Sequence, residues 1–311
     1  MSQPRLALVD YSDSSSDDEA APPPPKLRKT SADSAHAPAP ESLPSTLPPL
    51  PSRFLDLYAV NPRVGKDDDP TLHGGRKRSI PHVQGNWPTH VYIEWYLSRT
   101  EFDRLDALYN AAADAAKVAD TEFKLETHLK SDLGSEQPLH VSLSRPCVLR
   151  TEQREGFLET LTDRIYKARL KPFTVEFTGF SWVRNQDSTR WFFVLDCTTG
   201  PKNELPRLLD LSNRTVQSFN QPPLLGTHGD GSSGFHASLG WSLTKPSPEV
   251  EKKVAEAVKM KGNGVTLEDE VTKLMVSVDA IKVKIGNVLH VVEVGAHVGD
   301  EACETRKRRM S

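Results

Sequence analysis

The apolar and polar residues follow no regular period over the first 52 residues. This stretch consists mainly of Pro, Ser, Ala and charged residues, as in SDSSSDDE (12–19). Such a segment cannot bury enough apolar surface to offset the entropy that is lost when it is ordered. We therefore expect a disordered acidic, Pro- and Ser-rich tail over residues 1–52. An ordered region should then cover 53–294, and a flexible basic tail should cover 295–311.

The ordered region alternates between strand-like and helix-like periods. THVYIEWYL (89–97) alternates apolar and polar residues, which is typical of a half-buried strand. TEFDRLDALYNAAADAAK (100–117) repeats apolar residues at helical spacing, and Thr100 is its expected N-cap. Further elements are predicted as strands over 138–150, 172–185, 189–197 and 235–243, as helices from Thr151, over 203–219 and over 249–260, and as a hairpin over 280–294 that turns at Gly286–Asn287.

Two of the predicted strands carry the same short motif. One begins at His140 and reads HVSLS, and the other begins at His236 and reads HASLG. Two copies that also share the Leu are expected by chance well below about one time in a hundred. Residues two apart on a strand point to the same face, so His140 projects together with Ser142, and His236 projects together with Ser238.

The mixture of hairpins and helices predicts an α+β fold of two similar lobes. Each lobe would carry one motif strand, 140–144 in the first lobe and 236–240 in the second. If the lobes face each other, two imidazoles and two hydroxyls meet in one cleft. The alternative is structural: strand histidines with satisfied hydrogen bonds, and serines that are ordinary polar residues.

Two imidazoles and two hydroxyls in one cleft suit the cleavage of an RNA phosphodiester. Near neutral pH, one His can accept a proton while the other, when protonated, donates one. Hydroxyls donate hydrogen bonds to phosphate oxygens without adding charge. RNA also supplies its own nucleophile, the 2′-hydroxyl. This chemistry therefore calls for no metal and no cofactor.

Composition agrees with a soluble chain and argues against several other classes. Hydrophobic residues make up 37% and charged residues 26%, and the net charge is −3. No apolar run approaches the roughly 18 residues that a membrane span needs. The three cysteines lack CxxC spacing, which argues against a disulfide framework or a zinc site and favours a reducing compartment. The basic clusters KLRK (26–29) and RKRR (306–309) are typical of nuclear-import signals or of solvated chain ends.

The two motifs resemble the paired His-x-Ser/Thr signatures of the two-histidine phosphoesterase superfamily. Other stretches resemble its U6 small nuclear RNA (snRNA) phosphodiesterase family: HGGRKRSIPHVQGNWPTHVYI (73–93), LHVSLSRPCVLR (139–150), IKVKIGN (281–287) and the opening LVDYSDSSSDDE (8–19). The resemblance covers about residues 73–294. It implies a bilobal, LigT-like α+β fold, in which two antiparallel-sheet lobes with flanking helices surround a central groove.

The resemblance also implies roles for the motif residues. It makes His140 and His236 the acid–base pair, and it makes Ser142 and Ser238 the phosphate-binding residues. In this family the second-motif histidine takes the 2′-hydroxyl proton, and the first protonates the leaving 5′-oxygen. The implied protein is a metal-independent 3′→5′ RNA exonuclease of the nucleus that trims the oligouridine 3′ end of U6 snRNA. It would leave a 2′,3′-cyclic phosphate, which some members open to a monophosphate.

Four residues near the motifs are weaker candidates for substrate contacts. Tyr92 lies in the first predicted strand, Arg145 follows the first motif, and Phe235 and Trp241 flank the second. Aromatic side chains can stack on RNA bases, but on strands they more often pack in the core, so packing is the alternative for these three aromatics. We expect RNA as the partner of a monomeric chain, with splicing-associated proteins as further partners.

Other histidines and two departures from the family pattern complete the sequence features. His73, His82 and His90 lack metal-ligand spacing, and we expect loop or capping roles for them. The glycine-rich stretch 224–235 and the stretch 251–270 differ from the pattern of the family.

Two other functions fit the motifs less well. A cyclic phosphodiesterase or tRNA-ligase-like activity on small nucleotides would use the same four motif residues. A non-catalytic, splicing-associated RNA-binding protein would keep the fold without needing their chemistry. The intact pair of motifs favours an enzyme, because a scaffold has no chemical use for all four side chains.

Overall fold

The computed structural model describes residues 83–131, 133–185, 187–224, 234–262 and 264–295. The tail predicted over 1–52 lies outside the described residues, and so does the predicted C-terminal tail apart from Gly295. His73 and His82 also lie outside them. The statements below concern the described residues.

The helices and strands follow the predicted order with a few additions. The strands are β1 (Asn86–Trp95), β2 (Glu126–Thr127), β3 (Leu139–Ser142), β4 (Cys147–Arg150), β5 (Phe173–Arg184), β6 (Trp191–Cys197), β7 (His236–Ser242), β8 (Lys261–Gly262), β9 (Val265–Thr266), β10 (Met275–Val278), β11 (Ala280–Ile285) and β12 (Val288–Glu293). The helices are α2 (Arg99–Ala119), the 3₁₀ turn η2 (Thr151–Gln153), α3 (Arg154–Ala168), α4 (Glu204–Ser218), α5 (Pro248–Val258) and α6 (Leu267–Val271). The predicted α+β class is confirmed.

One antiparallel sheet brings the two motif strands together. Its order is β10-β5-β6-β7-β3-β1-β11-β12, with β2 paired to β7 and β4 paired to β1. The strands that carry the two motifs, β3 and β7, are therefore direct neighbours in the middle of the sheet. The C-terminal hairpin of β11 and β12 returns to pair with β1. The sheet beyond β1 is thus continued by strands from the C-terminal part of the described chain.

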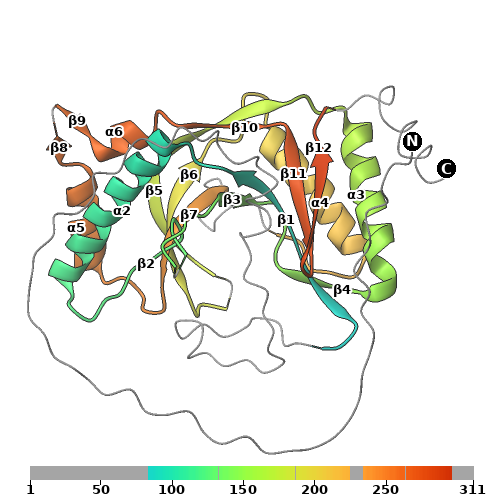
Figure 1. Cartoon of the computed structure of the whole chain (residues 1–311), viewed down its shortest axis with the longest axis horizontal. Helices are drawn as coiled ribbons and strands as arrows, with labels where there is room; N and C mark the ends of the chain where they lie inside the picture. The colour runs from blue at the N-terminus through green and yellow to red at the C-terminus, as the bar shows by residue number, and fades with distance from the viewer. Residues whose placement is uncertain (1–82, 132, 186, 225–233, 263, 296–311) are drawn as a thin grey trace, which may run out of the picture. The chain divides into compact units, whose positions relative to one another are not determined.

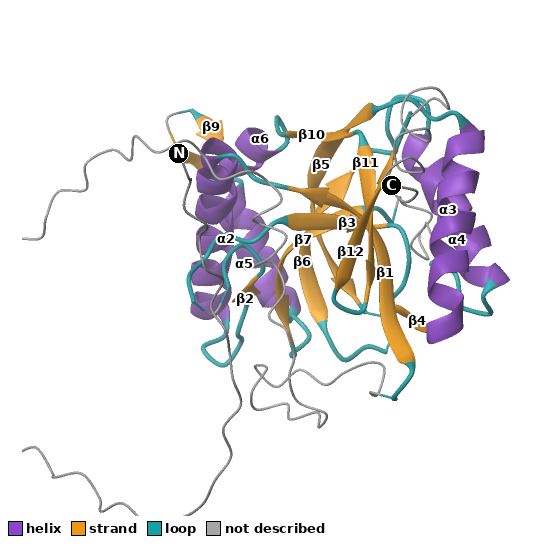
Figure 2. Cartoon of the chain, turned by 45° about the vertical axis from the view of Figure 1, so that its right-hand side comes forward, coloured by secondary structure: helices purple, strands orange, loops and turns teal. Residues whose placement is uncertain are grey.

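Two pairs of helices flank this sheet. Helices α2 and α5 lie side by side next to β6 and β7, and α3 and α4 lie side by side next to β1, β11 and β12 (Figure 1 and Figure 2). Apolar residues of both pairs, such as Leu105 in α2 and Phe157 in α3, belong to one buried cluster with the sheet. Burial of this kind contributes roughly 25 cal/mol for each Å² of apolar surface removed from water.

Alternate residues of the central strands divide the sheet into an apolar face and a polar face. The apolar face consists of buried side chains: Val91, Ile93, Leu139, Val141, Ala237, Leu239, Ile281 and Val283. The residues between them are histidines, serines, a tyrosine, a glutamate and lysines, and these are less buried. A shift of the strand pairing by one residue would move the imidazoles into the core. The hydrophobic pattern therefore specifies the strand register.

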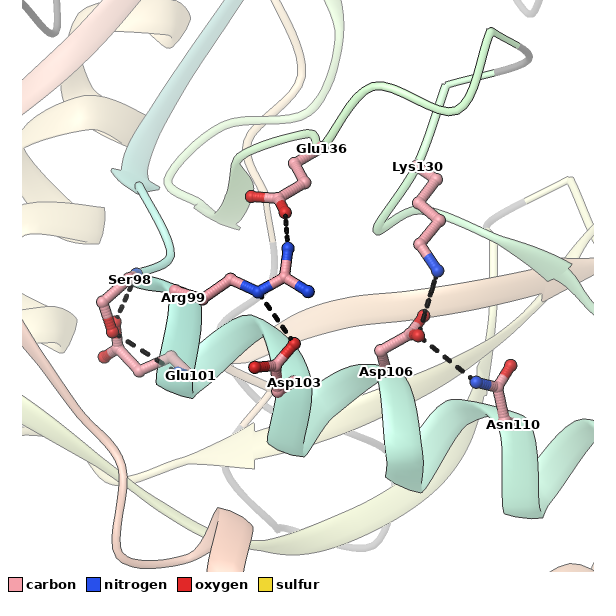
Figure 3. Close-up of polar contacts among 8 residues, drawn as sticks. All are labelled: Ser98, Arg99, Glu101, Asp103, Asp106, Asn110, Lys130 and Glu136. Carbon is pink, nitrogen blue, oxygen red and sulfur yellow. Dashed lines mark hydrogen bonds and ion pairs between the residues drawn. The ribbon is translucent and has the colours of Figure 1, made fainter. Parts of the chain in front are cut away.

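Helix α2 begins two residues earlier than its predicted N-cap implied. Ser98, not Thr100, is the N-cap, because its side chain accepts a hydrogen bond from the Glu101 amide at 3.4 Å. The Glu101 carboxylate in turn accepts from the Ser98 amide at 2.7 Å, which completes a capping box (Figure 3). Thr100 is already inside the helix, so its hydroxyl does not cap the first amides.

Helix α2 also holds the segment that leads into β3. Lys130 Nζ lies 2.8 Å from the Asp106 carboxylate, and Arg99 lies 3.0 Å from Glu136 (Figure 3). The first pair is partly shielded from water, whereas the second is more exposed, so the second adds little stability by itself. Together the two pairs tie the segment between β2 and β3 to the helix, and Glu136 lies four residues before the first motif begins.

The predicted hairpin at the C-terminal end of the domain is confirmed. It turns at Gly286, which has φ of +61°. A Cβ atom at this position would lie 2.6 Å from the Trp87 ring, so glycine is needed there for space as well as for its backbone conformation. The close approach packs the turn against β1 and fixes β11 beside that strand.

Candidate functional site

The two His-x-Ser motifs form one compact array on the polar face of the sheet. Strands β3 and β7 run antiparallel and meet at the pair Val141 and Ala237. The antiparallel direction places His140 on the side of Ser238 and places Ser142 on the side of His236. The two histidines therefore occupy one diagonal of the array, and the two serines occupy the other. Diagonal neighbours on adjacent strands have Cβ atoms roughly 7–8 Å apart or somewhat less.

His236 is held in a defined orientation and tautomer. Its Nδ1 lies 2.8 Å from the carbonyl oxygen of Gly234. Because a carbonyl oxygen can only accept, Nδ1 carries the hydrogen in this contact. A neutral His236 then has its lone pair on Nε2, which is the atom that can take a proton. The backbone just before β7 thus prepares His236 to act as a base.

The surroundings of His140 favour its neutral form. Desolvation by nearby protein atoms and the charge of His236 lower the pKa of His140 from 6.5 to about 4. The residue is nevertheless exposed to solvent, so water offsets part of the desolvation. The direction of the shift is what matters for the chemistry: two imidazoles this close resist being protonated at the same time.

A third histidine, His90 on β1, belongs to the same array. Its Nε2 lies 3.2 Å from Ser142 Oγ, and its ring centroid lies 5.5 Å from that of His140 in an edge-on arrangement. The expected loop or capping role for His90 was wrong, because this residue lies within a strand of the sheet. The signal was available in the sequence: His90 and Tyr92 alternate with buried Val91 and Ile93 in the predicted strand.

His90 stays neutral over the whole physiological range. Burial, and then the charges of His140 and Lys284, lower its pKa from 6.5 to about 3. Lys284 lies directly opposite His90 on β11. A protonated His90 would therefore lie close to the Lys284 ammonium and partly shielded from water.

His90 should make the protein sensitive to acid. In the unfolded chain its pKa returns to about 6.5, so below that pH the unfolded state binds a proton that the folded state excludes. The stability that neutral His90 contributes is complete above pH 6.5 and is lost as the pH falls towards 3. The wild-type protein should lose unfolding free energy between pH 7 and pH 5, and His90→Gln should make this loss about 2 kcal/mol smaller. Urea unfolding at the two pH values measures this difference, and equal losses in both proteins would contradict it.

The polar face continues beyond the histidines. Tyr92 lies beside the motif residues, with its ring centroid 5.5 Å from that of His140. Glu94 lies opposite His140 and pairs with Lys282 at 3.4 Å. Asp196 on β6 lies opposite His236. Sequence reasoning placed Tyr92 near the substrate but missed the charged residues, because only the sheet order brings β6 and β11 next to the motif strands.

The other weaker candidates lie in less favourable places. Phe235 is 4% exposed and Trp241 is 6% exposed, so both side chains pack in the interior and present little surface to a base. Arg145 lies in the turn between β3 and β4 and is partly exposed. The glycine-rich loop before β7 lies outside the described residues over 225–233.

The described residues show neither a metal-binding cluster nor a helix that could span a membrane. No cluster of three or more His, Cys, Asp or Glu residues with the arrangement of a metal site is found among them. Among the same residues, no helix has the length and apolar character needed to span a membrane. Cys147 and Cys197 are buried free thiols, and burial raises the pKa of Cys147 to about 12.

A family model and several known proteins are similar to this chain. A family model named HVSL, described as an uncharacterised conserved protein, matches residues 48–293. The U6 snRNA phosphodiesterase 1 of Neurospora crassa is 36% identical over 275 residues, which are 80% of this chain and 75% of the relative. The human U6 snRNA phosphodiesterase 1 is 30% identical over 264 residues, which are 84% of this chain and 89% of the relative.

A solved structure is also similar. It is that of Kluyveromyces marxianus Usb1 with uridine monophosphate, which is 17% identical to this chain. The match has a TM-score of 0.49 and covers 66% of this chain and 97% of the solved one.

Proposed function

This chain belongs to the U6 snRNA phosphodiesterase family, and we propose that it is a 3′→5′ RNA phosphodiesterase that trims the 3′ end of U6 snRNA. The observation that carries this proposal is the array of two His-x-Ser motifs on the neighbouring strands β3 and β7. The array offers a base, an acid and two hydroxyl groups on one face of two neighbouring strands. The oligouridine end is the substrate that the family relationship implies.

The reaction follows from the two histidines and the RNA's own hydroxyl. Nε2 of His236 takes the proton of the 2′-hydroxyl on the penultimate nucleotide, which frees that oxygen to attack the adjacent phosphorus. The bond from phosphorus to the 5′-oxygen of the terminal nucleotide breaks, and His140 donates a proton to this leaving oxygen. The products are a free terminal nucleoside and a shortened RNA that ends in a 2′,3′-cyclic phosphate. The hydrogen bond from His236 to Gly234 supports its assignment as the base.

His140 must be protonated to act as the acid, and binding of the substrate favours this protonation. In the free chain its pKa is lowered to about 4, so the neutral form dominates at pH 7. A phosphodiester anion in the array favours the charged imidazole and raises this pKa on binding. The protonated acid therefore forms mainly in the complex with RNA, where it is used.

The remaining residues of the array bind rather than transfer protons. Ser142 and Ser238 donate hydrogen bonds to the non-bridging phosphate oxygens, each contributing roughly 1.5–3 kcal/mol to a charged group. Tyr92 lies beside His140 and offers an aromatic ring to the neighbouring nucleotide. The parts of the sheet around β7 and around β3 act as the two lobes of a two-histidine phosphoesterase, and the polar face between them is its groove.

The proposal also covers the domain boundaries, the cellular location and the partners of the enzyme. Residues 53–294 form the phosphodiesterase domain, and the segments on either side are tails that catalysis does not need. A role in maturing U6 snRNA calls for a nuclear location. It also calls for contact with splicing-associated proteins, while the domain itself works as a monomer.

The proposal is tested with a 3′-oligouridylated RNA in EDTA. We expect stepwise loss of 3′ uridines at an unchanged rate, because the two imidazoles and the substrate's hydroxyl supply the whole reaction. Product ends are identified by mass spectrometry, and the same RNA incubated with the His140→Ala variant serves as the control. Loss of turnover in EDTA with rescue by a divalent ion would overturn this mechanism. Activity on small cyclic nucleotides alone would overturn the assignment of substrate.

A further inference from the structure

His90 contacts one of the proposed phosphate-binding serines but lies outside both motifs. It belongs to β1, which pairs with β3 so that Tyr92 lies opposite Ser142. From the same face of β1, the His90 ring reaches the serine, with 3.2 Å between Nε2 and Ser142 Oγ. Ser238, the matching serine of the second motif, lies opposite Val194 on β6 and on the side of His140 on β3. The two serines therefore have different neighbours.

A serine hydroxyl rotates freely unless another group holds it. The ring tautomer decides which atom donates in this contact. In the tautomer with the hydrogen on Nε2, His90 donates to Ser142 Oγ, and the hydrogen of the serine hydroxyl remains available for a phosphate oxygen. The contact also selects one position of Oγ among the staggered positions of the side chain. A serine held in this way loses less entropy when it binds phosphate than a serine that must first be ordered.

The electrostatics of His90 favour a binding role rather than proton transfer. Burial and the charges of His140 and Lys284 lower its pKa, which favours the neutral imidazole at the pH where RNA is cleaved. A neutral ring adds no positive charge beside His140, whose ring centroid is 5.5 Å away. What remains for His90 is the geometry of its hydrogen bond.

We propose that His90 is a positioning residue for Ser142, holding the serine hydroxyl in the orientation that binds the scissile phosphate. This inference rests on the proposed function, in which Ser142 is a phosphate anchor. His90 acts through the serine and touches no reacting atom. A change at His90 should therefore matter only while Ser142 is present.

A double-mutant cycle between the two residues tests this dependence. Ser142→Ala and His90→Leu should each slow cleavage of oligouridylated RNA by about tenfold or more, the loss expected for one hydrogen bond to a charged group. The variant that combines both changes should be no slower than Ser142→Ala alone. His90→Gln should keep its rate within about threefold of wild type, because its neutral amide can still donate near the position of Nε2.

A matched control and a folding measurement complete the experiment. His290→Gln makes the same substitution at a histidine of the edge strand β12 and should leave the rate unchanged. Urea unfolding at pH 7.5 shows whether each variant is folded under the assay conditions. Losses that multiply in the double variant, or a Gln variant as slow as the Leu variant, would overturn the positioning role. A wild-type rate for Ser142→Ala would overturn the phosphate-anchor role itself and this inference with it, so the two failures are distinguishable.

Discussion

His140→Ala and His236→Ala are each expected to lower kcat on oligouridylated RNA by about 10²–10⁴-fold. Each change removes one half of a general acid–base pair, and a positioned acid or base contributes a factor of this size. His236 is prepared for its role by the hydrogen bond from its Nδ1 to Gly234, and His140 lies across the array from it. Single-turnover rates with enzyme in excess measure the effect on cleavage apart from product release.

The losses of rate caused by the two histidine substitutions should not be additive. The variant that lacks both should be little slower than the slower single variant, because residues that act as one unit are strongly non-additive. His290→Ala is the matched control, since it changes a histidine on β12 that is outside the array, and it should keep the wild-type rate. If the losses multiply instead, the two motifs work independently and the repeated motif has a structural cause.

A single 2′-deoxyuridine at the penultimate position of the RNA should abolish cleavage of the terminal nucleotide. The attacking oxygen in the proposed reaction is the 2′-hydroxyl of that nucleotide, and no group of the array replaces it. The expected result is no detectable release of the terminal nucleoside over a time in which the all-ribose RNA is fully shortened. High-resolution gel electrophoresis of a 5′-labelled RNA measures the difference.

The position of the deoxy nucleotide provides the control. The same change at the terminal nucleotide leaves the attacking hydroxyl in place, so this RNA should be shortened by one nucleotide at nearly the normal rate. The penultimate deoxy RNA should also compete with the all-ribose RNA for binding, because its phosphate and bases are intact. Cleavage of the penultimate deoxy RNA at the normal rate would refute attack by the 2′-hydroxyl, and would point to water as the nucleophile.

The local pattern was sufficient to predict most of the elements. The alternation in residues 89–97 corresponds to β1, and the helical spacing in residues 100–117 corresponds to α2. The paired motifs lie on strands, with each His and Ser on the same face, because side-chain alternation is a property of any strand. Family membership also agrees with the resemblance of the motif stretches.

Other features could not be predicted from the local pattern. They depend on which of two similar residues forms a cap, or on which strands distant in the sequence pair with each other. Ser98 and Thr100 are both good N-caps, and the capping box with Glu101 decides between them. Strand β10 is short, and its pairing with β5 joins segments about a hundred residues apart. His90 could have been assigned to the polar face from its parity in β1, but its contact with Ser142 depends on the pairing of β1 with β3.

The sequence by itself determined the strands, the face to which each motif residue points and the chemistry that two imidazoles and two hydroxyls can perform. These properties depend on residues that are close in the sequence, so the local sequence pattern is enough to predict them. Only the tertiary structure decided that β3 and β7 meet, that His90 reaches Ser142, and that the C-terminal strand β11 brings Lys284 opposite His90. Pairing between distant strands is governed by the burial of the whole apolar face against the helices, and this is a property of the assembled sheet.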